Sequence, residues 1–132
     1  MQKIMLGFIA ILLMTMNSYA QEAVTAEDPN VSSFHIDSLL GALQKDDKRW
    51  TSFIKGKNVL TGLYHLKAGE EDRQQPHDTD EVYYVIEGKA KFITDEQEIP
   101  VTKGSVLFVK AEVAHKFVAI EEDLVIIVFF DQ

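Results

Sequence analysis

The sequence predicts an all-β domain with a short N-terminal helix, and three observations support this prediction. Beyond Trp50, short runs rich in Val, Ile, Tyr and Phe alternate at near-regular spacing with Gly or polar pairs, which is typical of antiparallel strands. The chain has 132 residues, which is room for one domain. Its composition, 46% hydrophobic and 26% charged, is typical of a globular protein with a core.

Composition also excludes several classes of function. The formal net charge is -8 and no basic cluster is present, so the sequence does not predict a nucleic-acid-binding protein. The chain has no Cys, which excludes disulfides, thiolate metal sites and Cys nucleophiles. Histidines, carboxylates and amides are left as the groups that can carry chemistry.

Residues 1–20 have the pattern of a signal peptide. Lys3 precedes an apolar run from Ile4 to Met16, and Ser18 and Ala20 place small side chains where a signal peptidase cleaves. The run is shorter than the roughly 20 residues that a membrane crossing needs, which favours export over a retained N-terminal anchor. We therefore expect an exported, periplasmic or extracellular protein with no stable membrane insertion after cleavage.

The remaining chain divides into a linker and one folded domain. Residues 21–31 are polar and without periodicity, so we interpret them as a flexible linker that leads into a single domain over residues 32–132. The first element of that domain is a predicted amphipathic helix over residues 37–48, with Asp37 as its N-cap. Its apolar face consists of Leu39, Leu40 and Leu43.

Eight short strands are predicted after the helix, in a sandwich, jelly roll or small barrel. Their ranges are 50–54, 59–66, 82–86, 90–94, 99–101, 106–109, 115–119 and 124–130. The last range reads Leu-Val-Ile-Ile-Val-Phe-Phe without alternation, so we expect both of its faces to be covered. It is either a central strand between two layers or one side of a dimer interface.

One stretch of the chain combines a histidine with acidic residues directly before the start of a predicted strand. By the two-residue period, Glu81, Tyr83 and Val85 share one strand face, and a carboxylate facing inward needs a partner or a metal. His77 precedes Glu81 by four residues, and His115 opens another strand. Two imidazoles and one carboxylate form a ligand set that leaves open positions on a first-row metal.

These residues also have more ordinary interpretations. A His and a Glu four positions apart in an acidic loop usually form a solvated surface pair. Tyr83 is a candidate for contacting a bound cofactor, and core packing is its alternative role. For His35 and His65 we expect surface or packing roles, and we expect the acidic segment 70–72 to be a solvated loop.

Two segments carry a resemblance to a known family. Residues 76–88, PHDTDEVYYVIEG, resemble the first motif of the cupin superfamily, in which a His-x-His pair is followed by Glu and then by Gly. Residues 104–115, GSVLFVKAEVAH, resemble the second motif, a Gly-led strand that ends in a turn and a His. Lys110 and Glu112 replace the Pro and Gly that are common in that turn. The resemblance extends over roughly residues 58–130.

The resemblance implies a cupin-type jelly-roll β-barrel with a metal ion inside. Its motif residues correspond to His77, Glu81 and His115 as ligands, while Gln75 stands where the family has its first His. An amide oxygen is a weaker ligand than imidazole, so Gln75 would bind the metal loosely or hydrogen-bond a metal-bound water. Gln74 could take that role through a shift of one residue.

The implied cofactor is a divalent metal ion, with Fe or Mn favoured and Ni or Zn as alternatives. The first hypothesis for function is a metal-dependent oxygenase- or isomerase-type cupin that acts on a small oxygenated molecule. The second is a non-catalytic exported protein that binds a small molecule or metal. The third is a structural homodimer with a vestigial site. No catalytic residue is identified, and substrate identity does not follow from the fold.

Overall fold

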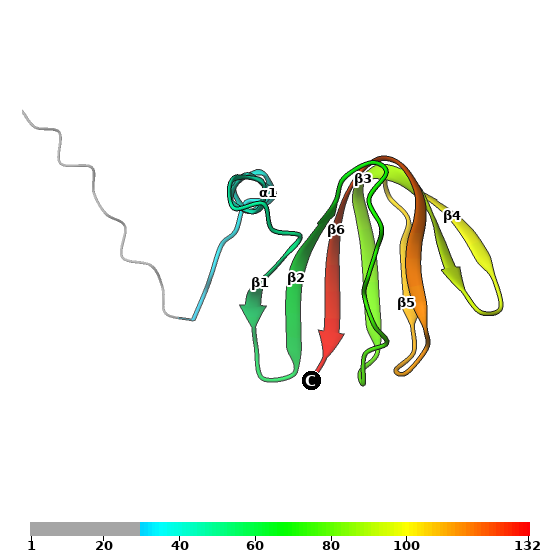
Figure 1. The fold of residues 1–132 in the computed structure, drawn as a ribbon. Coiled ribbons are helices and arrows are strands. Elements are labelled where there is room, and N and C mark those ends of the chain that lie inside the picture. Colours follow the sequence, from blue (N-terminus) through cyan, green and yellow to red (C-terminus); the bar gives the residue numbers. More distant parts are fainter. Residues whose placement is uncertain (1–29) are drawn as a thin grey trace, which may run out of the picture. The chain divides into compact units, whose positions relative to one another are not determined.

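Two long strands form the spine of the fold in this computed structural model, which describes residues 30–132. Strand β3 (Glu81–Thr94) and strand β6 (His115–Asp131) pair antiparallel, from Glu81 opposite Phe130 to Thr94 opposite His115. Figure 1 shows that this two-stranded ribbon bends over at the top of the domain, so that both of its ends lie at the bottom.

The other strands extend the spine on both sides. They are β1 (Trp50–Lys55), β2 (Val59–Leu66), β4 (Glu98–Thr102) and β5 (Val106–Val109). The sheet order is β1-β2-β6-β3-β4, and β5 pairs with the first part of β3. Together with the single described helix, these antiparallel strands confirm the predicted all-β jelly-roll fold within the compact unit 33–132.

The structure has six strands where the sequence predicted eight, because two predicted breaks are bends. The ranges 82–86 and 90–94 join into β3 across Gly88, and 115–119 and 124–130 join into β6. Gly88 has a φ of +101°, and the β3–β6 register shifts on both sides of it. A Glu-Gly pair that resembles a turn therefore forms a β-bulge, which inserts extra residues and increases the twist.

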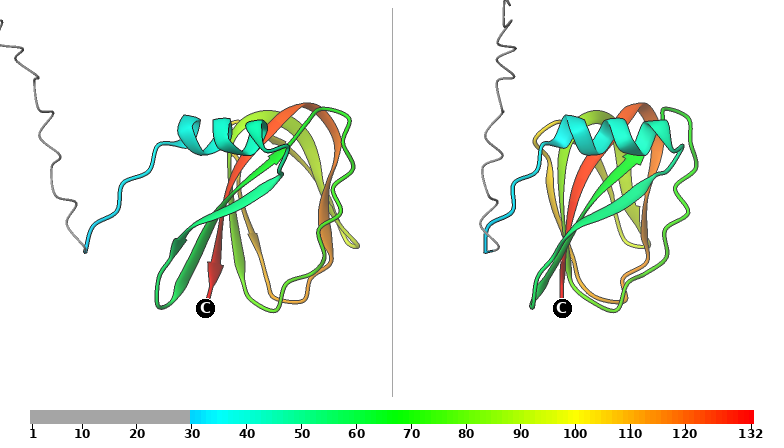
Figure 2. Two further views of the ribbon diagram at one scale, coloured as in Figure 1. Left: turned by 60° about the vertical axis from the view of Figure 1, so that its left-hand side comes forward. Right: turned by 90° about the vertical axis from the view of Figure 1, so that its left-hand side faces the viewer.

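The segment between β2 and β3, residues 67–80, closes the open side of the barrel (Figure 2). The backbone N–H of Gly69 donates to the Ile120 carbonyl at 2.9 Å, and the N–H of Phe117 donates to Asp72 Oδ2 at 2.8 Å, so the segment follows the free edge of β6. Its end is fixed by Asp80, whose Oδ1 accepts the N–H of Ala111 at 2.9 Å.

Apolar side chains fill two layers on either side of the sheet. The barrel interior contains Tyr83, Phe92, Phe117 and ten further buried hydrophobic residues. On the outer face, Leu63 and Val125 pack with Leu43 of the helix. Strand β6 lies between β2 and β3 and has buried residues on both faces, which confirms the prediction of a central strand for its second half.

The helix α1 (Ile36–Lys45) is shorter than predicted and begins earlier. Its N-cap residue is His35, so the prediction of Asp37 as N-cap is wrong, and Asp37 lies in the first turn. The helix ends at Lys45 because Asp47 adopts a left-handed φ of 50° and the N–H of Lys48 donates to the Leu43 carbonyl at 2.9 Å. That pattern is a Schellman motif, which cannot continue as helix.

The predicted signal peptide, residues 1–20, and most of the linker, residues 21–31, lie outside the described residues and stay predictions. In the part of the chain that the structure describes, no helix has the length and apolar character needed to cross a membrane.

Candidate functional site

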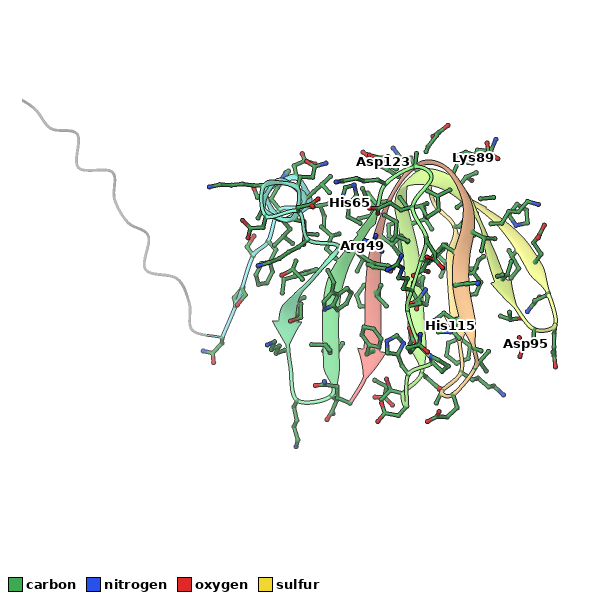
Figure 3. The ribbon with its side chains drawn as sticks, in the orientation of Figure 1. Arg49, His65, Lys89, Asp95, His115 and Asp123 are labelled. Carbon is green, nitrogen blue, oxygen red and sulfur yellow. The ribbon has the colours of Figure 1, made fainter. Side chains whose placement is uncertain are left out.

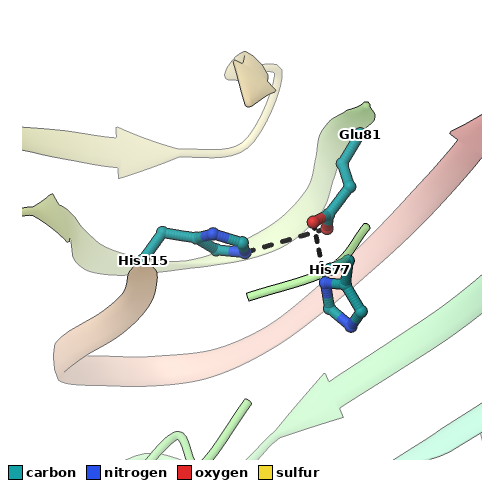
Figure 4. Close-up of side chains that lie close together, drawn as sticks. All are labelled: His77, Glu81 and His115. Carbon is teal, nitrogen blue, oxygen red and sulfur yellow. Dashed lines mark hydrogen bonds and ion pairs between the residues drawn. The ribbon is translucent and has the colours of Figure 1, made fainter. Parts of the chain in front are cut away.

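Three side chains of the kind that bind metals meet where the two ends of the β3–β6 ribbon come together (Figure 4). Glu81 is the first residue of β3, His115 is the first residue of β6, and His77 belongs to the segment that leads into β3. Each offers one ligand atom, and these atoms lie within 4.8 Å of one another. In the strand register His115 pairs with Thr94, so it is the bend of the ribbon that brings it to Glu81.

The group is buried on one side and open on the other. Glu81 Oε1 lies 2.7 Å from His77 Nδ1, and Glu81 Oε2 lies 3.7 Å from His115 Nε2. The side chains of Glu81 and His115 are 1% and 0% exposed, whereas that of His77 is 37% exposed. The solvated surface pair weighed from the sequence is thus not what forms, since only the His77 side of the pair reaches solvent.

The Tyr83 hydroxyl lies at the centre of this group. It is 2.5 Å from Glu81 Oε2, 2.8 Å from His115 Nε2 and 3.0 Å from Gln74 Oε1. Burial raises the pKa of Tyr83 well above its ordinary value of 10.0, and the hydrogen bond to Glu81 raises it further. The hydroxyl therefore keeps its proton and donates it to one of these neighbours at a time.

Acceptor atoms surround that hydroxyl. His115 Nδ1 lies 2.7 Å from the Val113 carbonyl, which only accepts, so Nδ1 carries a hydrogen; in the tautomer with no hydrogen on Nε2, that atom presents a lone pair to the Tyr83 hydroxyl. Gln74 Nε2 donates to Asp72 Oδ2 at 2.7 Å, which turns the Gln74 oxygen toward Tyr83. In that tautomer the single hydrogen of the Tyr83 hydroxyl cannot satisfy three acceptor atoms. The lone pairs of this group therefore fit a metal cation or an additional proton.

Asp72 supports the site from behind and is buried, at 4% exposed. Its carboxylate accepts hydrogen bonds from the Tyr64 hydroxyl at 2.7 Å, from the Phe117 N–H at 2.8 Å, and from the side chain and backbone N–H of Gln74. The expectation of a solvated acidic loop is therefore wrong for Asp72. No sequence pattern separates it from its exposed neighbours, because its partners come from β2 and β6.

The structure brings Gln74, and not Gln75, to the group. Gln75 is exposed, and its side-chain amide donates to the Arg73 carbonyl at 3.4 Å. Gln74 is half-buried and contacts the Tyr83 hydroxyl. The one-residue shift considered from the sequence therefore describes where the amide lies.

A cavity of about 600 Å³ opens beside His77. Aromatic rings form one wall: the centroid of Phe130 is 5.1 Å from that of His77 and 5.8 Å from that of Trp50, and Trp50 lies 6.3 Å from Tyr64. The remaining lining residues are Leu60, Gln74, Asp78, Thr79, Tyr83, Val128, Asp131 and Gln132. The wall is apolar and the floor, where Tyr83 and Gln74 lie, is polar.

The other two histidines lie outside this group. His35 is exposed at the start of the helix. His65 is 3% exposed and its Nε2 lies 3.8 Å from Asp123 Oδ2, at the end of the barrel opposite His115 (Figure 3). Both placements confirm the surface and packing roles expected from the sequence.

Comparison with known proteins identifies the same fold and family features. The family model of the cupin domain matches residues 62–130. An uncharacterized protein of Streptomyces coelicolor is 40% identical over 100 residues, which are 76% of this chain and 95% of that protein.

Solved structures are similar at low sequence identity. A protein of Neisseria meningitidis superposes with a TM-score of 0.61 at 16% identity, over 76% of this chain and all of that one. The salicylate 1,2-dioxygenase of Pseudoaminobacter salicylatoxidans, solved as a mutant in complex with gentisate, superposes with a TM-score of 0.62 at 16% identity. That match covers 73% of this chain but 31% of the dioxygenase chain. At these identities the likeness shows the fold alone.

Proposed function

This chain belongs to the cupin family, and from that premise we propose that its barrel binds a divalent metal ion through His77, Glu81 and His115. The convergence of their ligand atoms within 4.8 Å, largely shielded from solvent, is the observation that carries the proposal. The surplus of acceptors around the Tyr83 hydroxyl supports it, because a cation would neutralise lone pairs that face one another.

The donor set suits several first-row metals. Two imidazoles and one carboxylate suit Fe or Mn, and also Ni or Zn, and leave coordination positions open. We assign the position of a weak fourth contact to Gln74 rather than Gln75, on the basis of its contact with Tyr83. When bound, the ion would supply Lewis-acid or oxygen-activating chemistry to a small oxygenated molecule.

We propose that the surrounding residues position such a molecule and control its protons. The aromatic wall excludes water from one side of the cavity. The Tyr83 hydroxyl holds a proton next to Glu81 and His115, where it can be donated to an oxygen atom of a bound ligand. This combination supports an oxygenase- or isomerase-type reaction on a small oxygenated molecule as the leading candidate.

A non-catalytic binding protein is the second candidate. It is favoured by the absence of a third imidazole: Gln75 stands where the cupin motif has its first His, and the amide that lies near the group is that of Gln74. Fewer strong ligands lower metal affinity. In that case the same cavity captures a small molecule or a metal ion without turnover. A structural homodimer with a vestigial site is the third candidate.

Elemental analysis of protein purified without chelator or added metal tests the metal site. We expect a first-row metal in the wild-type protein and its loss in His77→Ala and Glu81→Gln, with His35→Ala as the matched control that replaces an exposed histidine. Bound metal should also increase the free energy of unfolding, by about 3 kcal/mol at a metal concentration of a hundred times its Kd, and so raise the melting temperature. Equal metal content in all four proteins would refute the ligand assignment, and metal-free wild-type protein would leave a non-catalytic small-molecule-binding protein and the structural homodimer as candidates.

We further propose a homodimer and export. Apolar side chains on the outer face of β5, β3 and β6 support the dimer, namely Tyr84, Val106, Phe108 and Phe129, which are 38–65% exposed. The strand register places them next to one another. The signal-peptide pattern of residues 1–20 supports export to the periplasm or the medium, ahead of a linker and one folded domain.

A further inference from the structure

Within the described part of the chain, the Asp, Lys and Arg side chains that could give the cavity lining a fixed charge are represented by Asp alone. Among the described residues that line it, none is Lys or Arg, whereas Asp78 and Asp131 both contribute to it. The arginines of the neighbouring segments are engaged elsewhere: Arg49 donates to the Glu71 carbonyl at 3.0 Å, and Arg73 Nε donates to a Glu71 carboxylate oxygen at 3.0 Å. A carboxylate or phosphate group in the outer cavity would therefore meet acidic side chains and no cationic partner.

A second negative layer lies behind the polar floor. Tyr64 and Gln74 line the cavity, and both donate hydrogen bonds to the buried carboxylate of Asp72. In a buried setting this charge is screened less than a surface charge. The electrostatic preference of the cavity thus does not depend on the two exposed aspartates alone.

The aromatic wall adds an attraction for flat or cationic groups. Trp50 lies directly on β2, because Gly62 has no side chain there and a Cβ atom would approach the indole to 2.0 Å. Phe130 and Trp50 meet at an interplanar angle of 82°, so the wall forms a corner rather than a plane. Aromatic rings stack with other rings, and their faces attract cations.

We infer that the cavity accepts a small molecule whose oxygen atoms coordinate at its end near His77 and which carries an uncharged or a cationic group at its other end, and that the cavity selects against an anionic group there. This inference rests on the proposed metal site for the oxygen-donor end. The preference at the outer end arises from the aromatic wall and the acidic lining, which exist without a metal.

Three compounds with the same ring diol and similar side chains test the charge preference. They are 4-ethylcatechol, dopamine and 3,4-dihydroxyphenylacetate, which carry a neutral, a cationic and an anionic group, and their binding is measured by calorimetry on Zn(II)-loaded full-length protein without oxygen. We expect the first two to bind at least about tenfold more tightly than the acid. Equal or tighter binding of the acid would overturn the inference.

Matched variants connect the preference to the lining. Asp131→Asn should reduce the advantage of dopamine over the acid, whereas Asp95→Asn, which removes the same charge at the far β3–β4 hairpin (Figure 3), should leave it unchanged. An equal effect of both variants would mean that net charge alone sets the preference, and this would overturn the role of the cavity lining.

A metal-independent measurement separates this inference from the proposed function. Trp50 is the only tryptophan of the chain and belongs to the cavity wall, so its emission reports on occupancy. In chelator-treated protein we expect phenethylamine to change this emission at lower concentration than phenylacetate. That result would support the inference even if no metal binds. A stronger response to phenylacetate would refute it even if the metal site is confirmed.

Discussion

Asp72 illustrates how one buried carboxylate orients the residues of the candidate site without belonging to the group of His77, Glu81 and His115. It accepts hydrogen bonds from β2, from β6 and from the connecting segment, and through Gln74 it orients the amide oxygen that meets Tyr83. The cost of burying a carboxylate is offset only if its oxygens keep their hydrogen-bond donors. Replacing it affects stability and the site together.

We predict that Asp72→Asn destabilises the fold by about 2–3 kcal/mol, because one carboxylate oxygen becomes an NH₂ group that faces other donors. Urea unfolding followed by circular dichroism measures the loss. Asp95→Asn, at an exposed hairpin position, is the control and should change stability by less than about 0.5 kcal/mol. If Asp72→Asn leaves the free energy of unfolding unchanged, the hydrogen bonds around this carboxylate contribute little to stability.

Tyr64 gives the fold a predictable response to alkaline pH. Burial, and then the hydrogen bond to Asp72, raise the pKa of Tyr64 well above its ordinary value of 10.0. Above pH 10 the Tyr64 hydroxyl loses its proton in the unfolded chain but keeps it in the folded protein. The contribution of Tyr64 to the free energy of unfolding is therefore complete below pH 10 and decreases as pH rises, by up to about 1.4 kcal/mol per pH unit. Unfolding free energies at several pH values above 10 should fall less steeply in Tyr64→Phe.

At the residue level, the sequence was sufficient for His77, Glu81 and His115 as candidates, because a strand period and two short motifs place them at strand mouths. It was not sufficient for Asp72 and for the choice between Gln74 and Gln75. Both depend on how the connecting segment lies along β6, and a segment without periodicity carries no signal for its path.

At the level of elements, the bend of the β3–β6 ribbon determines the site. Gly88 lies at the bend, where a Cβ atom would approach the Asp123 carbonyl oxygen to 2.3 Å. The sequence predicted the strand positions on both sides of Gly88, but it could not distinguish a turn from a bulge, since Glu-Gly suits both. The register between β3 and β6, which decides the matter, is a contact between distant parts of the chain.

Two glycine substitutions should have opposite effects on stability. Gly88→Ala combines a left-handed φ with a backbone clash, and we expect a loss of about 2–4 kcal/mol. Gly41→Ala, on the exposed side of α1 with no atom near the new Cβ, should stabilise the protein by about 0.5–1 kcal/mol. Thermal unfolding of both variants decides this, and a stable Gly88→Ala protein would show that the bend does not require glycine.

At the level of the whole molecule, the two faces of the sheet differ in how they are covered. The inner face of the sheet packs around the barrel core, and the helix packs on part of the outer face. On another part of the outer face, Phe108 and Val106 of β5 are 61% and 65% exposed. Alternation along the strands predicted that Tyr84 faces outward, but the extent of this apolar surface follows only from the pairing of β5 with β3.

We predict that Phe108→Glu converts the proposed dimer to a monomer, because a charge is placed in an apolar interface. Size-exclusion chromatography with light scattering measures the mass of the folded variant. Ile54→Glu, on β1 at the other edge of the sheet order, replaces a hydrophobic residue of 36% exposure and should leave the mass unchanged. A monomeric wild-type protein would refute the dimer.

The bent ribbon also has a kinetic meaning. Glu81 and His115 stand at opposite ends of one antiparallel pair of strands, and they meet only after that pair has formed and folded back on itself. Neither half of the chain can offer the two groups earlier, so any ion that they bind would find them together only after the ribbon has formed and bent. Such an ion would act as a latch on the finished barrel, slowing its opening rather than guiding its assembly.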